Sequence, residues 1–66
     1  DILELFDHNK QEFDKAIVSA KSKDDFHSSI EFLINNYGEK YNWDLNDKRL
    51  NFLLKDIYRH YKKLSS

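Results

Sequence analysis

Each of the three histidines has a carboxylate four residues away, the spacing that places two side chains on one face of a helix. The groups are His8 with Glu4 and Glu12, His27 with Glu31, and His60 with Asp56. Imidazole and carboxylate groups together could bind a metal ion or respond to pH. Zinc sites, however, need about four ligands that converge from more than one element, which one helix face cannot supply. We therefore expect solvated surface pairs, with no metal site and no cofactor.

Sequence motifs of common enzyme classes are absent. The chain has no cysteine, no Gly-rich phosphate loop, no HExxH motif and no GxSxG motif. A domain of 66 residues also has little volume to enclose a water-excluding pocket. We expect a protein that is not an enzyme and has no small-molecule substrate.

Charge is unevenly divided along the chain. Residues 1–33 hold eight acids and four lysines, whereas residues 34–66 hold four acids and seven bases. The bases near the end are Lys48, Arg49, Lys55, Arg59, Lys62 and Lys63. Such a stretch could contact phosphates and bases of nucleic acid, but Asp47 and Asp56 interrupt it and the net charge is −1. Nucleic-acid binding is thus the alternative hypothesis, beside a solvated face whose lysines favour the helix dipole.

Apolar residues outside the predicted core give the main functional hypothesis. At 100° per residue, Phe52 points roughly 160° away from Leu50, and its neighbours on that face are Lys48, Lys55 and Arg59. Other apolar residues outside the stripes are Trp43, Leu45, Phe32 and Val18.

Two interpretations of these residues stay open. Trp43, Leu45 and Phe52 could fold over one another and pin the loop before the last helix. Alternatively, they could form a binding patch for a protein partner or a second copy, because aromatic residues ringed by polar groups are common interface anchors. That patch would comprise Trp43, Leu45, Phe52, Lys48, Lys55, Arg59 and Phe32.

Three helices are predicted to position these side chains. Apolar residues at steps of three and four predict helices over about residues 2–20, 23–37 and 45–64. The short link between the first two predicts an antiparallel hairpin, with the third helix packed across it. The fold class is thus all-α, a three-helix bundle in one domain, residues 1–66. The predicted core is Phe6, Phe13, Ile17, Phe26, Ile30, Leu33, Leu50, Leu53, Leu54, Ile57 and Tyr61.

Local signals predict where the helices begin and end. Ser22 followed by Asp25 resembles a capping box for the second helix. Gly38 stands where a left-handed C-cap residue is wanted. Asp44 is the predicted N-cap of the third helix, and Asn46 is the competing cap.

Length and composition set the wider context. No apolar run approaches the roughly 20 residues that span a bilayer, and no signal-peptide pattern is present. Together with the lack of cysteine, this favours an intracellular location. The absence of methionine, even at position 1, predicts a domain excised from a larger protein or a processed product.

The stretch AKSKDDFHSSIEFLINNYG, residues 20–38, resembles the Nif11-type leader segments of peptide natural-product precursors. Those segments carry a similar pattern, in which small residues are followed by an acidic residue next to Phe and then by a helix. The stretch covers under a third of the chain. The connection GEKYNWDLND, and the lack of a Gly-Gly or Gly-Ala processing site, depart from the pattern. We base no functional prediction on this resemblance.

Overall fold

The computed structural model describes residues 2–65, with side chains placed through residue 64. Over these residues the chain is helical and contains no strand. The elements are the 3-10 helix η1 (Ile2–Phe6), α1 (Lys10–Ala20), α2 (Phe26–Leu33), the π-helical turn η2 (Ile34–Gly38) and α3 (Lys48–Ser65). The all-α, three-helix prediction is confirmed over this part of the chain.

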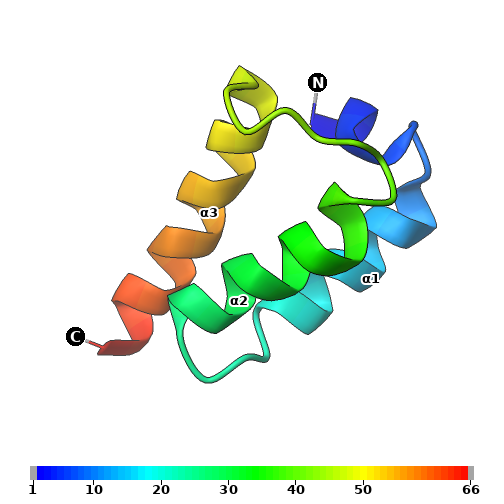
Figure 1. The fold of residues 1–66 in the computed structure, drawn as a ribbon. Helices are drawn as coiled ribbons and strands as arrows, with labels where there is room; N and C mark the ends of the chain where they lie inside the picture. The colour runs from blue at the N-terminus through cyan, green and yellow to red at the C-terminus, as the bar shows by residue number, and fades with distance from the viewer. Residues whose placement is uncertain (1, 66) are drawn as a thin grey trace.

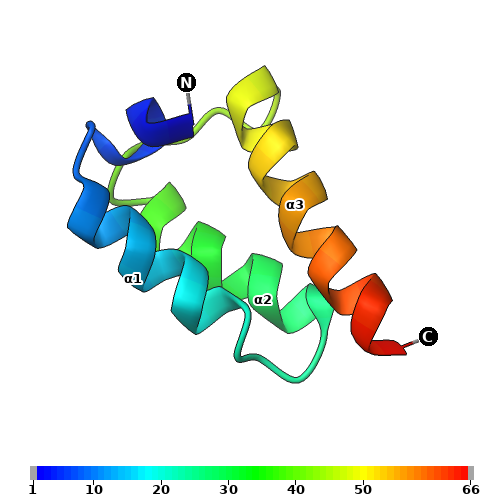
Figure 2. The same cartoon turned by 180° about the vertical axis from the view of Figure 1, so that it is seen from behind.

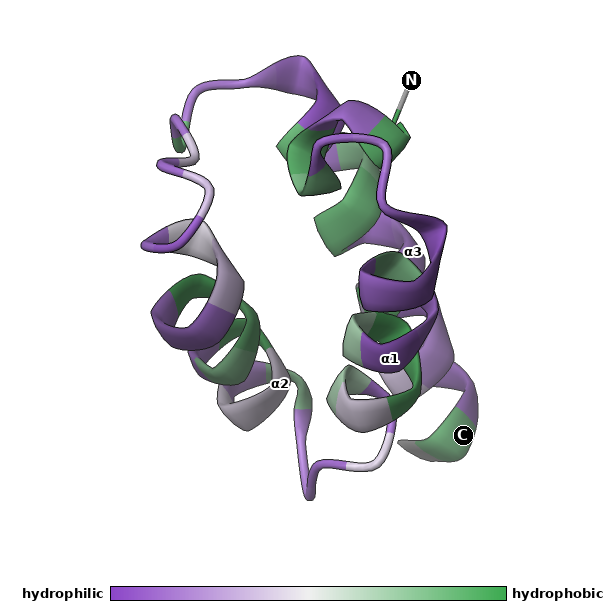
Figure 3. Cartoon of the chain, turned by 90° about the vertical axis from the view of Figure 1, so that its right-hand side faces the viewer, coloured by the Kyte–Doolittle hydropathy of each residue, from purple (hydrophilic) through white to green (hydrophobic). Residues whose placement is uncertain are grey.

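The three α-helices surround one core. Figures 1 and 2 show α2 doubling back beside α1 after a short turn. The last turns of α3 lie beside the start of α2, and the two helices diverge toward the start of α3, where η1 packs against it. Figure 3 shows green apolar and purple hydrophilic residues alternating along the helices, as expected of helices that bury one side.

The first predicted helix, residues 2–20, is interrupted in the structure. Asp7 and His8 have φ angles of 51° and 61°, in the left-handed region that an α-helix of L-residues cannot contain. After this break Asn9 caps α1, and its side chain accepts a hydrogen bond from the Glu12 amide at 3.1 Å. The prediction of one continuous helix is therefore wrong.

The start of α2 also differs from the prediction. The N-cap is Asp25, whose carboxylate accepts a hydrogen bond from the Ser28 amide at 2.8 Å, so α2 begins at Phe26 and not near residue 23. That backbone hydrogen bond lowers the pKa of the Asp25 carboxyl. Ser22 instead donates its hydroxyl to the Ser19 carbonyl at 2.7 Å, at the end of α1. The capping box predicted for Ser22 and Asp25 is wrong.

Gly38 has a packing role and not the predicted left-handed conformation. No glycine of the described chain has a positive φ; the left-handed residue of the following loop is Asn42, at 53°. Gly38 is buried, and a Cβ placed on it would lie 3.4 Å from the Trp43 ring and 3.5 Å from Ile34. At these distances a Cβ would make ordinary van der Waals contacts, so Gly38 packs beside both side chains without being required for their approach.

The start of α3 is set by a residue that the prediction placed inside the helix. Asp47 accepts a hydrogen bond from the Arg49 amide at 2.8 Å, and α3 begins at Lys48. Asp44 caps only a local loop turn, by accepting from the Asn46 amide at 2.9 Å. The predictions of Asp44, or of Asn46, as the N-cap are wrong, and so is the helix start at residue 45.

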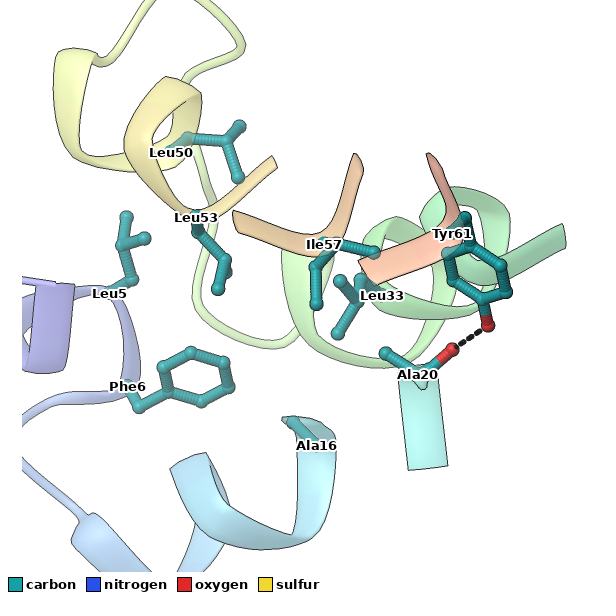
Figure 4. Close-up of a cluster of buried hydrophobic side chains, with 9 residues drawn as sticks. All are labelled: Leu5, Phe6, Ala16, Ala20, Leu33, Leu50, Leu53, Ile57 and Tyr61. Carbon is teal, nitrogen blue, oxygen red and sulfur yellow. Dashed lines mark hydrogen bonds between the residues drawn. The ribbon is translucent and has the colours of Figure 1, made fainter. Parts of the chain in front are cut away.

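The core contains the predicted residues but is centred differently. Phe6 is fully buried and meets the rings of Phe13, Tyr37, Tyr41 and Trp43 at centroid distances of 5.4–5.7 Å. Figure 4 shows the buried set, which is Leu5, Phe6, Ala16, Ala20, Leu33, Leu50, Leu53, Ile57 and Tyr61. The other predicted core residues, Phe13, Ile17, Phe26, Ile30 and Leu54, are partly buried against that set.

None of the helices in the described chain combines the length and the apolar character that crossing a membrane would require.

Candidate interaction surface

The two sides of α3 have opposite environments. Its inner side buries Leu50, Leu53 and Ile57, whereas Phe52, next to Leu53 in the sequence, is 63% exposed. Leu53 is only 1% exposed. Phe52 therefore lies outside the inner stripe, as its angular position predicted, and the loop does not cover it.

Cationic side chains surround Phe52. Lys48, Asn51, Phe52 and Lys55 line a shallow hollow with a volume near 180 Å³. Arg59 follows Lys55 by one helical turn and is exposed. Among the side chains that the structure describes, those of Lys48, Lys55 and Arg59 form no hydrogen bond and no ion pair. The surface around Phe52 thus carries uncompensated positive charge.

Arg49, the other cation at this end of α3, is used differently. Its guanidinium contacts Glu4 of η1 at 2.6 Å and Asp47 at 3.0 Å. Hydrogen bonds from the Arg49 side chain and amide lower the pKa of Asp47 to about 2. Arg49 therefore joins the start of α3 to η1.

Trp43 and Leu45, the two loop residues of the predicted patch, lie in different environments. The Trp43 indole N–H donates to the Leu5 carbonyl at 2.6 Å, and the ring meets Phe6 edge-to-face at 5.4 Å. Leu45 is 64% exposed. Trp43 therefore holds the loop through η1, and not through the predicted cluster with Leu45 and Phe52.

Phe32 belongs to the aromatic packing at the end of α2. It is half-buried, its ring meets Tyr37 at 5.9 Å, and the Lys23 ammonium lies 4.3 Å from its centroid. Two other large apolar residues of α3 are exposed as well, Tyr58 by 50% and Leu64 by 69%. At 100° per residue, Tyr58 lies about 80° from Leu50 and about 140° from Leu53, and this offset could have identified it as exposed. Leu64 lies within about 40° of both, so its exposure depends on where the neighbouring helices end and not on its angle.

The predicted grouping of His8 with Glu4 and Glu12 does not form on one helix face. The backbone break falls at His8, and Glu4 contacts Arg49. Glu12 pairs with Lys40 at 2.8 Å, and this hydrogen bond lowers the pKa of the Glu12 carboxyl. No group of three or more potential metal ligands occurs among the residues that the structure describes.

The other two histidines differ from each other. His27 lies 3.1 Å from Glu31, as the spacing predicted. His60 instead lies 3.1 Å from the Lys21 carbonyl oxygen, which ties α3 to the end of α1.

A family model described as Domain of unknown function (DUF8457) matches residues 2–62. The chain belongs to this family. The DUF8457 match includes η1, the aromatic cluster around Phe6 and nearly all of α3, so the surface around Phe52 lies within the family domain. No curated protein and no solved structure matches the chain.

Proposed function

We propose that the chain is a non-enzymatic protein-interaction domain that contacts its partner with the outer side of α3. The observation that carries the proposal is Phe52, a 63% exposed ring beside Lys48 and Lys55, two cations that form no ion pair within the described chain. A large aromatic side chain gains most when a partner covers it, and surrounding charges keep such a patch soluble when it is unbound.

The charge around Phe52 favours an acidic partner. Lys48, Lys55 and Arg59 would steer an acidic protein surface toward the patch, and Phe52 and Leu45 would supply the apolar contacts. A symmetric dimer through this surface would bring the same cations of two copies together, which is unfavourable. A different protein therefore fits better than a second copy.

Nucleic-acid binding is the second candidate function. It is favoured by one observation: Lys48, Lys55 and Arg59 have no carboxylate partner in the described chain. Cations in this state can replace the counterions of a phosphate backbone. The exposed apolar area of Phe52 and Leu45 fits this role less well.

The test compares Phe52→Ser with Val18→Ser, a matched change at a residue of α1 that is 70% exposed. Each protein is immobilised and exposed to lysate of the source cells. We expect partners held by the wild type and Val18→Ser to be lost from Phe52→Ser, with unfolding free energies within about 0.5 kcal/mol of each other. Unchanged capture by Phe52→Ser would contradict the proposal.

The nucleic-acid alternative is separated by charge reversal. The double variant Lys55→Glu, Arg59→Glu should abolish retention on heparin or DNA at rising salt if phosphates are the ligand. If the wild type is not retained at physiological salt, the alternative fails. Phe52→Ser should affect this retention little.

A further inference from the structure

A groove follows α3 on the side that faces the start of α2. Three shallow hollows, with volumes near 420, 380 and 180 Å³, adjoin one another there. Phe26 and Tyr58 line the first and second hollows, and Asn51 and Lys55 line the second and third. Together they extend from Leu64 to Lys48, a rise of about 24 Å along the helix. Figures 1 and 2 show the start of α2 beside the last turns of α3.

The floor of this groove has the spacing of a helix-packing seam. Along α3 the lining residues Asn51, Leu54, Tyr58 and Tyr61 follow steps of three, four and three. This is the spacing of the positions through which coiled-coil helices pack. Phe26 of α2 meets Tyr58 edge-to-face at 5.2 Å and widens the apolar floor. Tyr58 is nevertheless 50% exposed, so the seam remains open to solvent.

Lysines edge the groove at a regular interval. Lys48, Lys55 and Lys62 recur every seven residues and line the third, second and first hollows in turn. In paired helices, positions beside the seam carry charges that choose the partner by ion pairing. Lys48 and Lys55 form no ion pair within residues 2–65. Asp24 and Asp25 line the first hollow beside Lys62, so the edge is complementary to carboxylates at Lys48 and Lys55.

We propose that this groove binds an amphipathic helix of a partner protein. The helix would place an apolar stripe over Leu54 and Tyr58, and aspartates or glutamates at seven-residue intervals against Lys48 and Lys55. About 16 residues would fill the length of the groove. The α3 helix of a second copy has lysines at those positions and would repel, and nucleic acid would leave the apolar floor uncovered.

This site goes beyond the interaction surface around Phe52. At 100° per residue, Phe52 and Tyr58 differ by about 120° around α3, with Lys55 between them. The two sites share Lys48, Lys55 and the third hollow, so they are distinguished at Leu54 and Tyr58, which line only the groove.

The test uses two synthetic peptides of about 18 residues, measured by calorimetric titration. One has leucines at alternating steps of three and four and glutamates every seven residues; the other is a scramble of the same composition. We expect only the patterned peptide to bind, and to shift the NMR signals of Leu54 and Tyr58. Equal binding of the scramble, or no binding by the patterned peptide at about millimolar concentration, overturns the proposal.

Asn51 supplies a matched pair of variants, because it is exposed and lines two of the hollows. Asn51→Glu should weaken peptide binding about tenfold or more, whereas Asn51→Lys should preserve or strengthen it. Circular dichroism checks that both fold. Equal affinities of the two variants would reject the proposed charge recognition.

Phe52→Ser separates this proposal from the proposed function. Because Phe52 lines only the third hollow, Phe52→Ser should weaken peptide binding less than Asn51→Glu, which changes both the second and the third hollow. A larger loss of peptide affinity in Phe52→Ser than in Asn51→Glu places the peptide on the Phe52 patch and overturns the groove assignment. If the wild type forms dimers that Asn51→Glu dissociates, the groove binds a second copy and the proposal is overturned. If an oligonucleotide displaces the peptide, the groove binds nucleic acid and the proposal is likewise overturned.

Discussion

The N-terminal segment and α3 have similar apolar spacing but different structures. Residues 2–20 form two helices separated by the left-handed Asp7 and His8. Residues Lys48–Ser65 form one uninterrupted helix of 18 residues. The difference lies in what each segment must pack against.

In α3 a single inner stripe suffices. Leu50, Leu53 and Ile57 are fully buried without any change in helix direction. In the N-terminal segment, Phe6 must instead reach the centre of four aromatic rings from three other parts of the chain. The turn at Asp7 and His8 makes this possible, at the cost of two residues in an unfavourable conformation. Local pattern decides α3, whereas tertiary packing decides the N-terminal segment.

The largest effect is expected in α3. Leu53→Ala should lower the free energy of unfolding by about 2–5 kcal/mol, because it leaves a cavity at a residue that is 1% exposed. Circular dichroism of thermal unfolding would measure this loss. An unchanged melting curve would mean that the inner side of α3 is assigned to the wrong residues.

A smaller loss is expected where the loop meets the N-terminal segment. Trp43→Phe keeps a ring beside Phe6 but removes the N–H that donates to the Leu5 carbonyl. It should lower the unfolding free energy by about 1–2 kcal/mol in urea titrations. Leu45→Ala, at a 64% exposed residue of the same loop, is the control and should change it by less than about 0.5 kcal/mol.

A glycine substitution at the left-handed residue His8 should stabilise the fold, in contrast to the two changes above. His8→Gly relieves the left-handed strain and should raise the unfolding free energy by about 0.5–1 kcal/mol. Gln11→Gly, on the exposed side of α1, should instead lower it by about 1 kcal/mol. If both glycines destabilise equally, the left-handed conformation of His8 is not what limits this segment.

The smallest effect is expected from acid at the start of α3. The Asp47 pKa is lowered from 3.8 to about 2 in the folded chain, chiefly by the Arg49 side chain. Its stabilising contribution is complete above pH 3.8 and is lost as the pH falls through about 2. Asp47→Asn should therefore melt below the wild type at neutral pH, and the gap should close between pH 3.8 and about 2. A gap that stays constant over that range would contradict this account.

Sequence periodicity was sufficient for the fold class and for most of the core. Leu50, Leu53 and Leu33 were predicted correctly even though the predicted helix starts were wrong. Their spacing places them on the apolar side of a helix, and this does not depend on the residue at which the helix begins. Helix ends were less predictable. Several polar residues have side chains that can cap a helix, and only tertiary contacts decide among them: Ser22, Asp25, Asp44, Asn46 and Asp47. At the start of α3, Asp47 is favoured because Arg49, which it binds, also contacts Glu4 of η1.

The candidate surfaces divide in the same way. The angular position of Phe52 within one helix placed it outside the core stripe, but the sequence left open whether the loop would cover it. The position of Trp43 could not be predicted in this way. Its hydrogen-bond acceptor, Leu5, is distant in sequence, and Gly38, against which its ring packs, has no side chain to indicate a contact. The groove was missed because it depends on where α2 lies beside α3, which brings Phe26 to Tyr58.

The position of Trp43 has a spectroscopic consequence. It is the only tryptophan of the chain, and its indole lies against Phe6 and η2 with its N–H on the Leu5 carbonyl. Indole emission therefore reports the docking of η1 and the loop, and not the pairing of α2 with α3. A partial opening that releases η1 would shift the emission to longer wavelength while the far-ultraviolet helical signal of α3 persists. Trp43 fluorescence thus distinguishes the release of η1 and the loop from global unfolding of the domain.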